Sequence, residues 1–277
     1  MNHKLQNIFL ISIIIILLFG FAIELMYIEE MFRKATMTKE EQCEALCSER
    51  GEIAYFVKNS CFCKGPIKFE KRVRCFWNVT FEENEMLSSK FNSTSVRNIA
   101  VSSVVRYPIP VAPATRIFSI FNEVVNRVYY VPDPYNNEYV AFPLETWESK
   151  GGDCDDISVL LASLYEAVGF DAYIVEAYKK EKAHVFVMVK IDQSLDAFLK
   201  MYKRILERYT PYYGTKRFYF YALADNINQC EKIEKNIENN GDMTTFYMVV
   251  DGTSSEYPGY VDPATGYDRV VFLRIGE

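Results

Sequence analysis

The sequence predicts an α+β fold in which helices come first and mostly consecutive strands follow. Two amphipathic helical patterns, over about residues 115–129 and 153–169, precede most of the strand-like segments. From residue 170 onward, short apolar runs bounded by turn residues predominate. The chain has 277 residues, of which 49% are hydrophobic, and this suffices for one full domain and a smaller module.

The first element is a membrane signal. The uncharged stretch from Leu5 to Ile23 would form a helix about 28 Å long, close to the roughly 30 Å hydrocarbon core of a bilayer. Its length favours a transmembrane anchor within residues 1–28, with membrane contact through residues 5–28. A cleaved signal peptide is the alternative, because Gly20-Phe21-Ala22 provides small residues at the spacing that cleavage requires.

Residues 29–80 are expected to form a small module rich in cysteine. Cys43 and Cys47 would share one face of a helix, and Cys61 and Cys63 would share one face of a strand. A helix facing a strand could join these four cysteines in two disulfides, and the spacing leaves their pairing open. A zinc site is the alternative, but the spacings do not match the usual pattern in both halves.

Two further cysteines, Cys75 and Cys230, are left over and are a candidate third pair. The crowding of cysteines before residue 76 is typical of an oxidising compartment. Basic residues on both sides of the apolar stretch do not settle its orientation. We therefore expect a single-pass membrane protein with its body outside the cytoplasm, or a secreted protein if the signal is cleaved.

The composition limits the partners. The formal net charge is −6 and no long basic run occurs, so we expect no nucleic-acid partner. No nucleotide-binding loop or metal-binding motif is present, so we expect no cofactor and no metal site. The sequence says nothing of the oligomeric state.

Residues 81–113 are expected to connect the module to a domain over residues 114–277. Pro108, Pro110 and Pro113 exclude a regular helix near the end of this connector. The remaining elements follow from periodicity and turn residues. Strands are expected at residues 170–179, 183–191, 218–224, 245–251 and 269–275, and helices at residues 195–209 and 225–240, with the strands forming an antiparallel sheet.

The helix after Gly151-Gly152 carries the most informative residue. Asp153 is a good N-cap, and Asp156 stands where a capping box places its second side chain. Cys154 therefore falls in the first turn, where unpaired backbone N–H groups and the helix dipole favour a thiolate. Gly169 is expected to end the helix.

An imidazole and a carboxylate are available to act with this thiol. The only histidines are His3 and His184, so a base in the folded part must be His184, which lies early in an expected strand. A Cys–His pair needs a third group that orients the ring. Asp251 ends a strand that could lie beside the His184 strand. These three residues are the predicted catalytic group.

Each of these residues also has a structural explanation. A cysteine at a helix start can be an inert core residue, and a lone histidine is often structural. Asp251-Gly252-Thr253 is also typical of a turn. Asp155 and Asp156 would oppose a thiolate by their charge, and they could cap the helix or bind a cation. A non-catalytic surface binding or scaffold domain is therefore the second hypothesis.

The turn Gly152-Asp153-Cys154-Asp155-Asp156 before an apolar helix resembles the transglutaminase-like superfamily, especially its microbial cysteine proteinases. His184 followed by alternating apolar residues, and Asp251 followed within two residues by Thr253, also resemble that family, and so does the order of the three. The resemblance covers roughly residues 115–277. It implies a transglutaminase/papain-like core with helices packed on the antiparallel sheet.

The resemblance also implies a chemistry. The reaction would be thiol-dependent acyl transfer on an amide or isopeptide bond of a protein or peptide, either hydrolysis or cross-linking. The Cys154 N–H is the expected oxyanion donor, and the Trp147 indole is a second candidate. The sequence departs from the family by an insertion over residues 193–243. Asp262 is an alternative third residue, but an apolar strand leads directly into Asp251.

Overall fold

The computed structural model of the chain forms two compact units, Met1–Pro66 and Ile67–Glu277. The structure describes residues 20–22, 24–26, 28–29, 31, 36–57, 60–65, 67–77, 79–82, 84–134, 138–180, 182–210, 214–239, 241–260 and 269–273. Most of the expected anchor lies outside these residues. Among the helices of the described residues, none combines the length and the apolar character that a membrane span needs.

The first unit is a helix and a hairpin. Helix α2 (Lys39–Ser48) begins at Thr38, whose hydroxyl accepts from the Glu41 N–H while the Glu41 carboxylate accepts from the Thr38 N–H. This reciprocal capping box satisfies two N–H groups that the first helical turn leaves unpaired. Strands β1 (Ile53–Val57) and β2 (Ser60–Lys64) pair in antiparallel fashion.

Two disulfides join the helix to the hairpin. Cys43 bonds to Cys61 and Cys47 bonds to Cys63, with S–S distances of 2.06 and 2.01 Å. The two helical cysteines are buried, and they are the core of a unit too small to bury much apolar surface. Such bridges stabilise a small unit mainly by restricting its unfolded chain, each by about 2–4 kcal/mol. The three disulfides of the chain indicate an oxidising, extracellular environment for its body.

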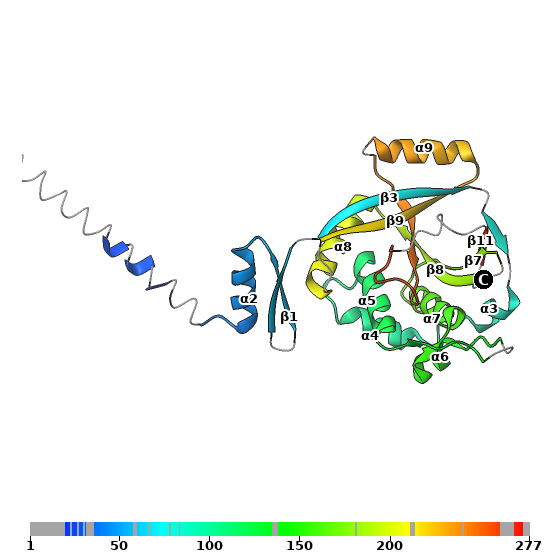
Figure 1. The fold of residues 1–277 in the computed structure, drawn as a ribbon, viewed down its shortest axis with the longest axis horizontal. Coiled ribbons are helices and arrows are strands. Elements are labelled where there is room, and N and C mark those ends of the chain that lie inside the picture. Colours follow the sequence, from blue (N-terminus) through cyan, green and yellow to red (C-terminus); the bar gives the residue numbers. More distant parts are fainter. Residues whose placement is uncertain are drawn as a thin grey trace, which may run out of the picture. The chain divides into compact units, whose positions relative to one another are not determined.

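The second unit is built on a seven-stranded sheet with the order β3-β9-β10-β8-β7-β11-β4 (Figure 1). The five central strands are antiparallel, whereas each edge strand is parallel to its neighbour. The strands are β3 (Ile67–Trp77), β4 (Thr80–Glu82), β7 (Ala172–Lys179), β8 (Lys182–Asp192), β9 (Gly214–Ala224), β10 (Thr245–Val250) and β11 (Arg269–Leu273).

Both edge strands, β3 and β4, lie in segments that the sequence analysis assigned to the cysteine-rich module and the connector. Strand β3 pairs with β9 along its whole length, from Ile67 opposite Gly214 to Trp77 opposite Ala224. The cysteine-rich unit therefore ends at Pro66 and not near residue 80, and the sheet is mixed and not purely antiparallel. Charged residues interrupt the apolar pattern of β3, so its sequence alone does not reveal a partner strand so distant in the chain.

Seven helices of the described residues pack around this sheet. Residues 81–113, expected as a connector, contain two of them, and both contact α7. The helix expected near residue 115 begins at Pro113, because a proline at the first helical position gives up no hydrogen bond. The helices are α3 (Glu85–Lys90), α4 (Arg97–Val105), α5 (Pro113–Val125), α6 (Pro143–Ser149), α7 (Cys154–Ala167), α8 (Leu195–Tyr209) and α9 (Ile227–Glu238).

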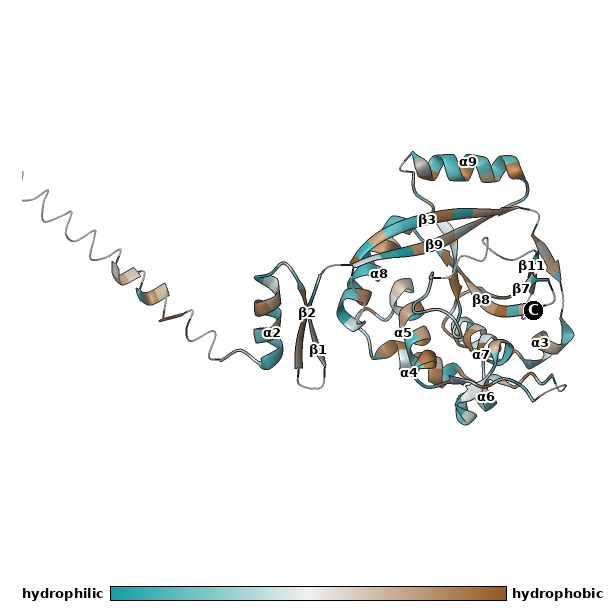
Figure 2. Ribbon diagram, in the orientation of Figure 1, coloured by the Kyte–Doolittle hydropathy of each residue, from teal (hydrophilic) through white to brown (hydrophobic). Residues whose placement is uncertain are grey.

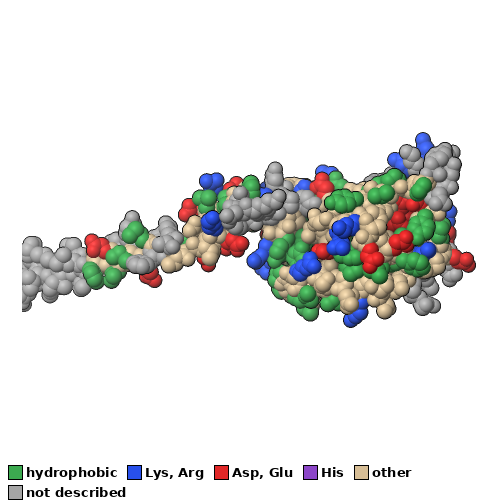
Figure 3. All heavy atoms as spheres, turned by 90° about the horizontal axis from the view of Figure 1, so that it is seen from below, with side chains coloured by type: hydrophobic (Ala, Val, Ile, Leu, Met, Phe, Trp, Pro, Cys, Tyr) green, Lys and Arg blue, Asp and Glu red, His purple; other side chains and the backbone are tan. Residues whose placement is uncertain are grey.

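Helix α9 covers the edge of the sheet. It is mostly hydrophilic in Figure 2, but Cys230 is buried and bonded to Cys75 of β3. The Glu234 carboxylate accepts from the Cys75 N–H, so part of the open edge of β3 is satisfied within the chain. Covering an edge strand in this way prevents it from pairing with another chain. Figure 3 shows one face of the molecule, on which side chains of both charge signs lie among apolar ones.

Candidate active site

Helix α7 places Cys154 at its first residue. Asp153 is the N-cap, and its side chain accepts from the Asp155 N–H at 3.2 Å. The Asp156 carboxylate accepts from the Asp153 N–H at 3.2 Å, which completes the expected capping box. The helix ends as expected, since Gly169 adopts a φ of 84° that other residues rarely reach.

A glycine is required just before this helix. A Cβ on Gly152 would lie 2.6 Å from the Asp156 Cβ and 2.8 Å from its Oδ2. The other oxygen of Asp156 accepts from the Ala141 N–H at 2.6 Å. The Asp156 carboxylate therefore fastens the segment before α6 to the start of α7. This is a positioning contact that the sequence did not reveal.

His184 and Asp251 come together because their strands are neighbours. Strands β8 and β10 pair with Val187 opposite Val250, although a long insertion separates them in sequence. That insertion supplies α8, β9 and α9, and β9 extends the sheet beyond β10. His184 Nε2 lies 2.7 Å from Asp251 Oδ2, and the two side chains are 22% and 1% exposed.

Asp251 is held by a turn of hydroxyl residues. Its Oδ1 accepts from the Thr253 N–H at 2.9 Å, the Thr253 hydroxyl at 2.8 Å and the Ser254 N–H at 3.1 Å. The Ser254 hydroxyl donates to Oδ2, the oxygen that also faces His184. Ser254 was missed by the sequence analysis. Its signal was a run of hydroxyl residues after an aspartate, which favours such local bonds.

The Asp251 turn packs directly on α7. A Cβ on Gly252 would lie 2.6 Å from the Ile157 Cγ2 and 3.0 Å from the Leu161 Cδ1. Only a glycine lets the backbone after Asp251 approach the helix so closely. Two elements that are distant in sequence, the start of α7 and the end of β10, are thereby held at a fixed separation.

The electrostatics of this group favour a protonated imidazole. Burial lowers the pKa of His184, but the hydrogen bond to Asp251 and the interactions with the Asp251 and Cys154 side chains outweigh it and raise the pKa to about 10. Burial raises the pKa of Asp251, yet the bonds from His184 and Ser254 bring it below its usual value.

The aspartates beside Cys154 behave in the opposite way. Burial, with hydrogen bonding and charge repulsion from Asp153, raises the pKa of Asp155 to about 8. Burial also raises the pKa of Asp156, against the lowering effect of its bonds to Ala141 and Asp153. The pKa of Tyr130 is raised by burial and by the charges of Cys154, Asp153 and Asp155, so its side chain lies in the same electrostatic environment.

One acidic group has the spacing of a metal site. Carboxylate oxygens of Asp153, Asp155 and Asp156 all lie within 4.8 Å of one another. Each carboxylate, however, already accepts a backbone N–H bond at the helix start. We assign these three residues to capping. The similar group of Cys43, Cys47 and Cys61 is explained by the disulfides.

The two remaining site predictions, for Trp147 and Asp262, stay predictions. Trp147 lies in α6 and is 9% exposed, and the Arg127 guanidinium stands 4.2 Å from the centroid of its ring. That packing accounts for its burial and leaves its role as an oxyanion donor a prediction. Asp262, the alternative third residue, lies outside the described residues.

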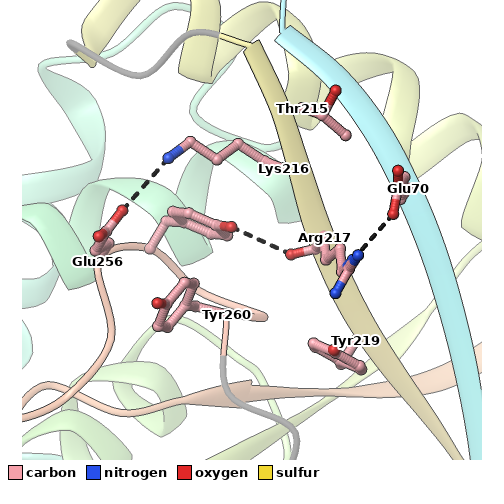
Figure 4. A pocket seen from close by; sticks show the side chains of 8 residues that line it. Glu70, Thr215, Lys216, Arg217, Tyr219, Glu256 and Tyr260 are labelled. Carbon is pink, nitrogen blue, oxygen red and sulfur yellow. Dashed lines mark hydrogen bonds and ion pairs between the residues drawn. The ribbon is translucent and has the colours of Figure 1, made fainter.

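A cavity of about 680 Å³ lies elsewhere, where the start of β9 faces the loop that follows Asp251 (Figure 4). None of Cys154, His184 and Asp251 lines it. Its charged groups pair with each other, Lys216 with Glu256 at 3.5 Å and Arg217 with Glu70 at 3.0 Å. The aromatic side chains of this cavity are those of Tyr219, Tyr257 and Tyr260. We assign no function to it.

Cys154 at a helix start, His184 on a strand and Asp251 at the end of the neighbouring strand thus belong to one α+β domain. The profile of the transglutaminase-like superfamily matches residues 109–200, which include Cys154 and His184. The chain therefore contains a transglutaminase-like superfamily domain.

The solved structures that resemble this chain match only part of it, at low sequence identity. A candidate cysteine protease from Cytophaga hutchinsonii is 14% identical, with 39% of this chain and 36% of that chain covered and a TM-score of 0.30. A candidate protease from Parabacteroides distasonis is also 14% identical, with 38% and 22% covered and a TM-score of 0.33. The matched part is thus only about a third or less of these two chains.

Calcium-bound LapG from Legionella pneumophila is 21% identical, with 38% of this chain and 62% of that chain covered and a TM-score of 0.26. No curated protein matches the chain. No residue role is transferred from any of these proteins.

Proposed function

We propose that this protein is a thiol-dependent acyl-transfer enzyme that acts on an amide or isopeptide bond of a protein or peptide. Cys154 is the nucleophile, His184 its acid–base partner and Asp251 the group that orients the ring. The observation that carries the proposal is the geometry of one imidazole. Its Nε2 meets Asp251 at 2.7 Å, and the interactions of the ring with Asp251 and Cys154 together raise its pKa to about 10.

In the first half of the reaction, the Cys154 thiolate attacks the carbonyl carbon and forms a C–S bond. The carbonyl oxygen becomes an oxyanion. As the tetrahedral intermediate collapses, the C–N bond breaks and the His184 imidazolium gives its proton to the leaving amine. The product of this half is a thioester on Cys154 and a free amine.

In the second half, water or another amine attacks the thioester and His184 takes the proton of the attacking group. Collapse of the second intermediate releases a carboxylic acid or a new amide and restores the thiolate. Asp251 stays ionised throughout and stabilises the imidazolium. Hydrolysis and cross-linking differ only in the attacking group.

The oxyanion needs donors at the helix start. No described residue accepts a hydrogen bond from the Cys154 N–H, which is one of the unpaired groups of the first turn of α7. This N–H is the proposed first donor. Trp147 stays the proposed second donor, and a Trp147→Phe variant, which removes the indole N–H, tests that part alone.

The proposal is tested first on the thiol. Iodoacetamide should alkylate Cys154 at pH 6 at a rate that a free thiol reaches only at higher pH, because the neighbouring imidazolium favours the thiolate. Cys154 is the one cysteine of the described residues outside a disulfide, so the readout is specific there. His184→Gln should shift the profile toward that of a free thiol.

Peptide and isopeptide substrates, screened with and without an added amine, then separate hydrolysis from cross-linking. Cys154→Ala should abolish turnover while leaving the circular dichroism spectrum unchanged. An alkylation profile of Cys154 that matches a free thiol, together with no turnover, would favour the non-catalytic binding domain instead.

A further inference from the structure

A second cavity lies beside the segment that leads to Cys154. Its volume is about 380 Å³. It opens between the end of α5 and the short parallel sheet of β5 (Tyr129–Tyr130) and β6 (Gly151–Gly152). The residues that line it are Asn122, Glu123, Asn126, Arg127, Tyr129 and Lys150.

Two cations of this cavity have no counter-ion. Within the part of the chain that the structure describes, neither Arg127 nor Lys150 forms an ion pair, and the buried Arg127 Nε has no hydrogen-bond partner. The one carboxylate of the wall, Glu123, is paired with Arg106 at 3.0 Å. Since Arg127 and Lys150 line the cavity without an opposite charge beside them among the described residues, an anionic ligand would stabilise this wall.

The two asparagine side chains of the wall are already hydrogen-bonded. The Asn126 amide donates to the Asn122 carbonyl at 2.6 Å, and the Asn122 amide donates to the Tyr107 hydroxyl at 3.1 Å. The Arg127 guanidinium is fixed in place by its stacking on Trp147, at 4.2 Å from the ring centroid. A ligand would therefore be recognised mainly by the two cations. The planar guanidinium of Arg127 and the compact ammonium of Lys150 both suit a carboxylate.

The cavity is within reach of the thiol. Lys150 precedes Cys154 by four positions, so their Cα atoms are at most about 14 Å apart. An extended peptide of about four residues spans that distance. A peptide joined to the sulfur can thus place a carboxylate in the cavity.

Strand β5, between the cavity and Cys154, has an open edge. The N–H groups of Tyr129 and Val131 donate to the carbonyls of Lys150 and Gly152. Since alternate residues of a strand face opposite edges, the Tyr130 N–H and carbonyl face away from β6. No described residue pairs with them, and the Tyr130 side chain is 57% exposed. An exposed edge of this kind accepts a peptide as an added strand.

We propose that the Arg127–Lys150 cavity is a subsite for a carboxylate of the acyl donor, which lies extended along the open edge of β5. The proposal rests on the proposed function, because it takes Cys154 as the reacting group. It assigns a substrate class: a polypeptide with an acidic side chain or a terminal carboxylate within about four residues of the reacting carbonyl. The Asp153 carboxylate beside the thiol would otherwise repel such a substrate.

The test uses reagents that alkylate Cys154 and carry a peptide of variable length. N-iodoacetyl peptides of one to four glycines, ending in a carboxylate or in the matched carboxamide, are reacted with the full chain. At the best length, the carboxylate should alkylate about tenfold faster than the carboxamide, as expected for one or two charge-assisted hydrogen bonds. A ratio at or below one at every length overturns the proposal.

Variants of Lys150 provide matched controls. Lys150 has a φ of 60°, which asparagine tolerates well, so Lys150→Asn removes the charge without straining the backbone. The ratio should fall to about one in Lys150→Asn and persist in Lys150→Arg. A ratio that persists in Lys150→Asn and in Arg127→Gln also overturns the proposal.

Failure of this inference is separable from failure of the proposed function. Plain iodoacetamide reports the reactivity of Cys154 in each variant, so a change in that reactivity is separated from a change in the carboxylate-to-carboxamide ratio. If its pH profile is that of a free thiol, the enzyme proposal fails. The carboxylate-to-carboxamide ratio still reports whether the cavity binds an anion.

Discussion

Two buried aspartates, one beside His184 and one beside Cys154, have pKa values that are shifted in opposite directions. Asp251, on the histidine side, is 1% exposed, and Asp155, on the cysteine side, is 8% exposed. The pKa of Asp251 lies below its usual value, whereas the pKa of Asp155 is raised to about 8. Burial opposes ionisation in both, so the difference comes from their neighbours.

The neighbours of Asp251 are donors, and those of Asp155 include other carboxylates. Thr253, Ser254 and His184 all donate to Asp251. Asp155 accepts from one N–H and faces Asp153 and Asp156. Much of the Asp155 population is therefore neutral at pH 7. The repulsion that the sequence suggested between these aspartates and a thiolate is reduced by the same burial that places them at the helix start.

The largest expected effect is a difference in turnover between variants of these two aspartates. Asp251→Asn leaves the imidazole without its charge partner and should lower turnover by about 10²–10⁴-fold. Asp155→Asn keeps an acceptor for the Asp156 N–H and should change turnover by less than about tenfold. Steady-state rates on a substrate from the screen provide the measurement. Similar losses in both variants would contradict the asymmetry.

A smaller effect is expected where the Asp251 turn touches α7. Gly252→Ala places a Cβ 2.6 Å from the Ile157 Cγ2, and the overpacking should lower the free energy of unfolding by about 1–3 kcal/mol. The turnover should fall as well, because Asp251 moves with its neighbour. Gly65→Ala is the control, since a Cβ there meets nothing within 4 Å. Equal melting temperatures for the two variants would show that the turn tolerates displacement.

Local patterns predicted the bounds of single helices and the start of α7 well. Helix α8 has the expected bounds, Leu195–Tyr209, and the capping box of Asp153 and Asp156 is present as predicted. These features depend on residues within a few positions of one another, and periodicity and caps report such short distances. The predicted neighbours β8 and β10 also pair, because both strands are strongly apolar.

Contacts between distant segments were not predictable in the same way. The parallel pairing of β3 with β9 joins residues far apart in the chain, and β3 carries charges at several positions. The close approach of Gly252 to Ile157 and the bond from Ala141 to Asp156 depend on tertiary packing alone. No period or spacing in one sequence encodes such contacts.

A third prediction follows from the raised pKa of Asp155. Its pKa rises from 3.8 in an unfolded chain to about 8 in the fold, so the folded state holds this proton more tightly. The stabilisation is complete below pH 3.8 and is lost as the pH rises through about 8. Between those limits, the natural protein should lose more thermal stability than Asp155→Asn. Parallel melting-temperature curves for the two proteins would contradict this assignment.

The smallest effect is expected at Ser254, whose hydroxyl supplies one of several bonds to Asp251. Ser254→Ala leaves the bonds from Thr253 and His184 in place, so turnover at pH 7 should fall by less than about tenfold. Because the lost bond favours ionised Asp251, the pKa of Asp251 should rise and the pKa of His184 should fall from about 10. Ring NMR signals of His184 report this shift, since His3 is the only other histidine of the chain. Ser254→Thr, which keeps a hydroxyl, should restore the titration. An unchanged His184 titration in Ser254→Ala would mean that this hydroxyl shapes the turn without tuning the charge of Asp251.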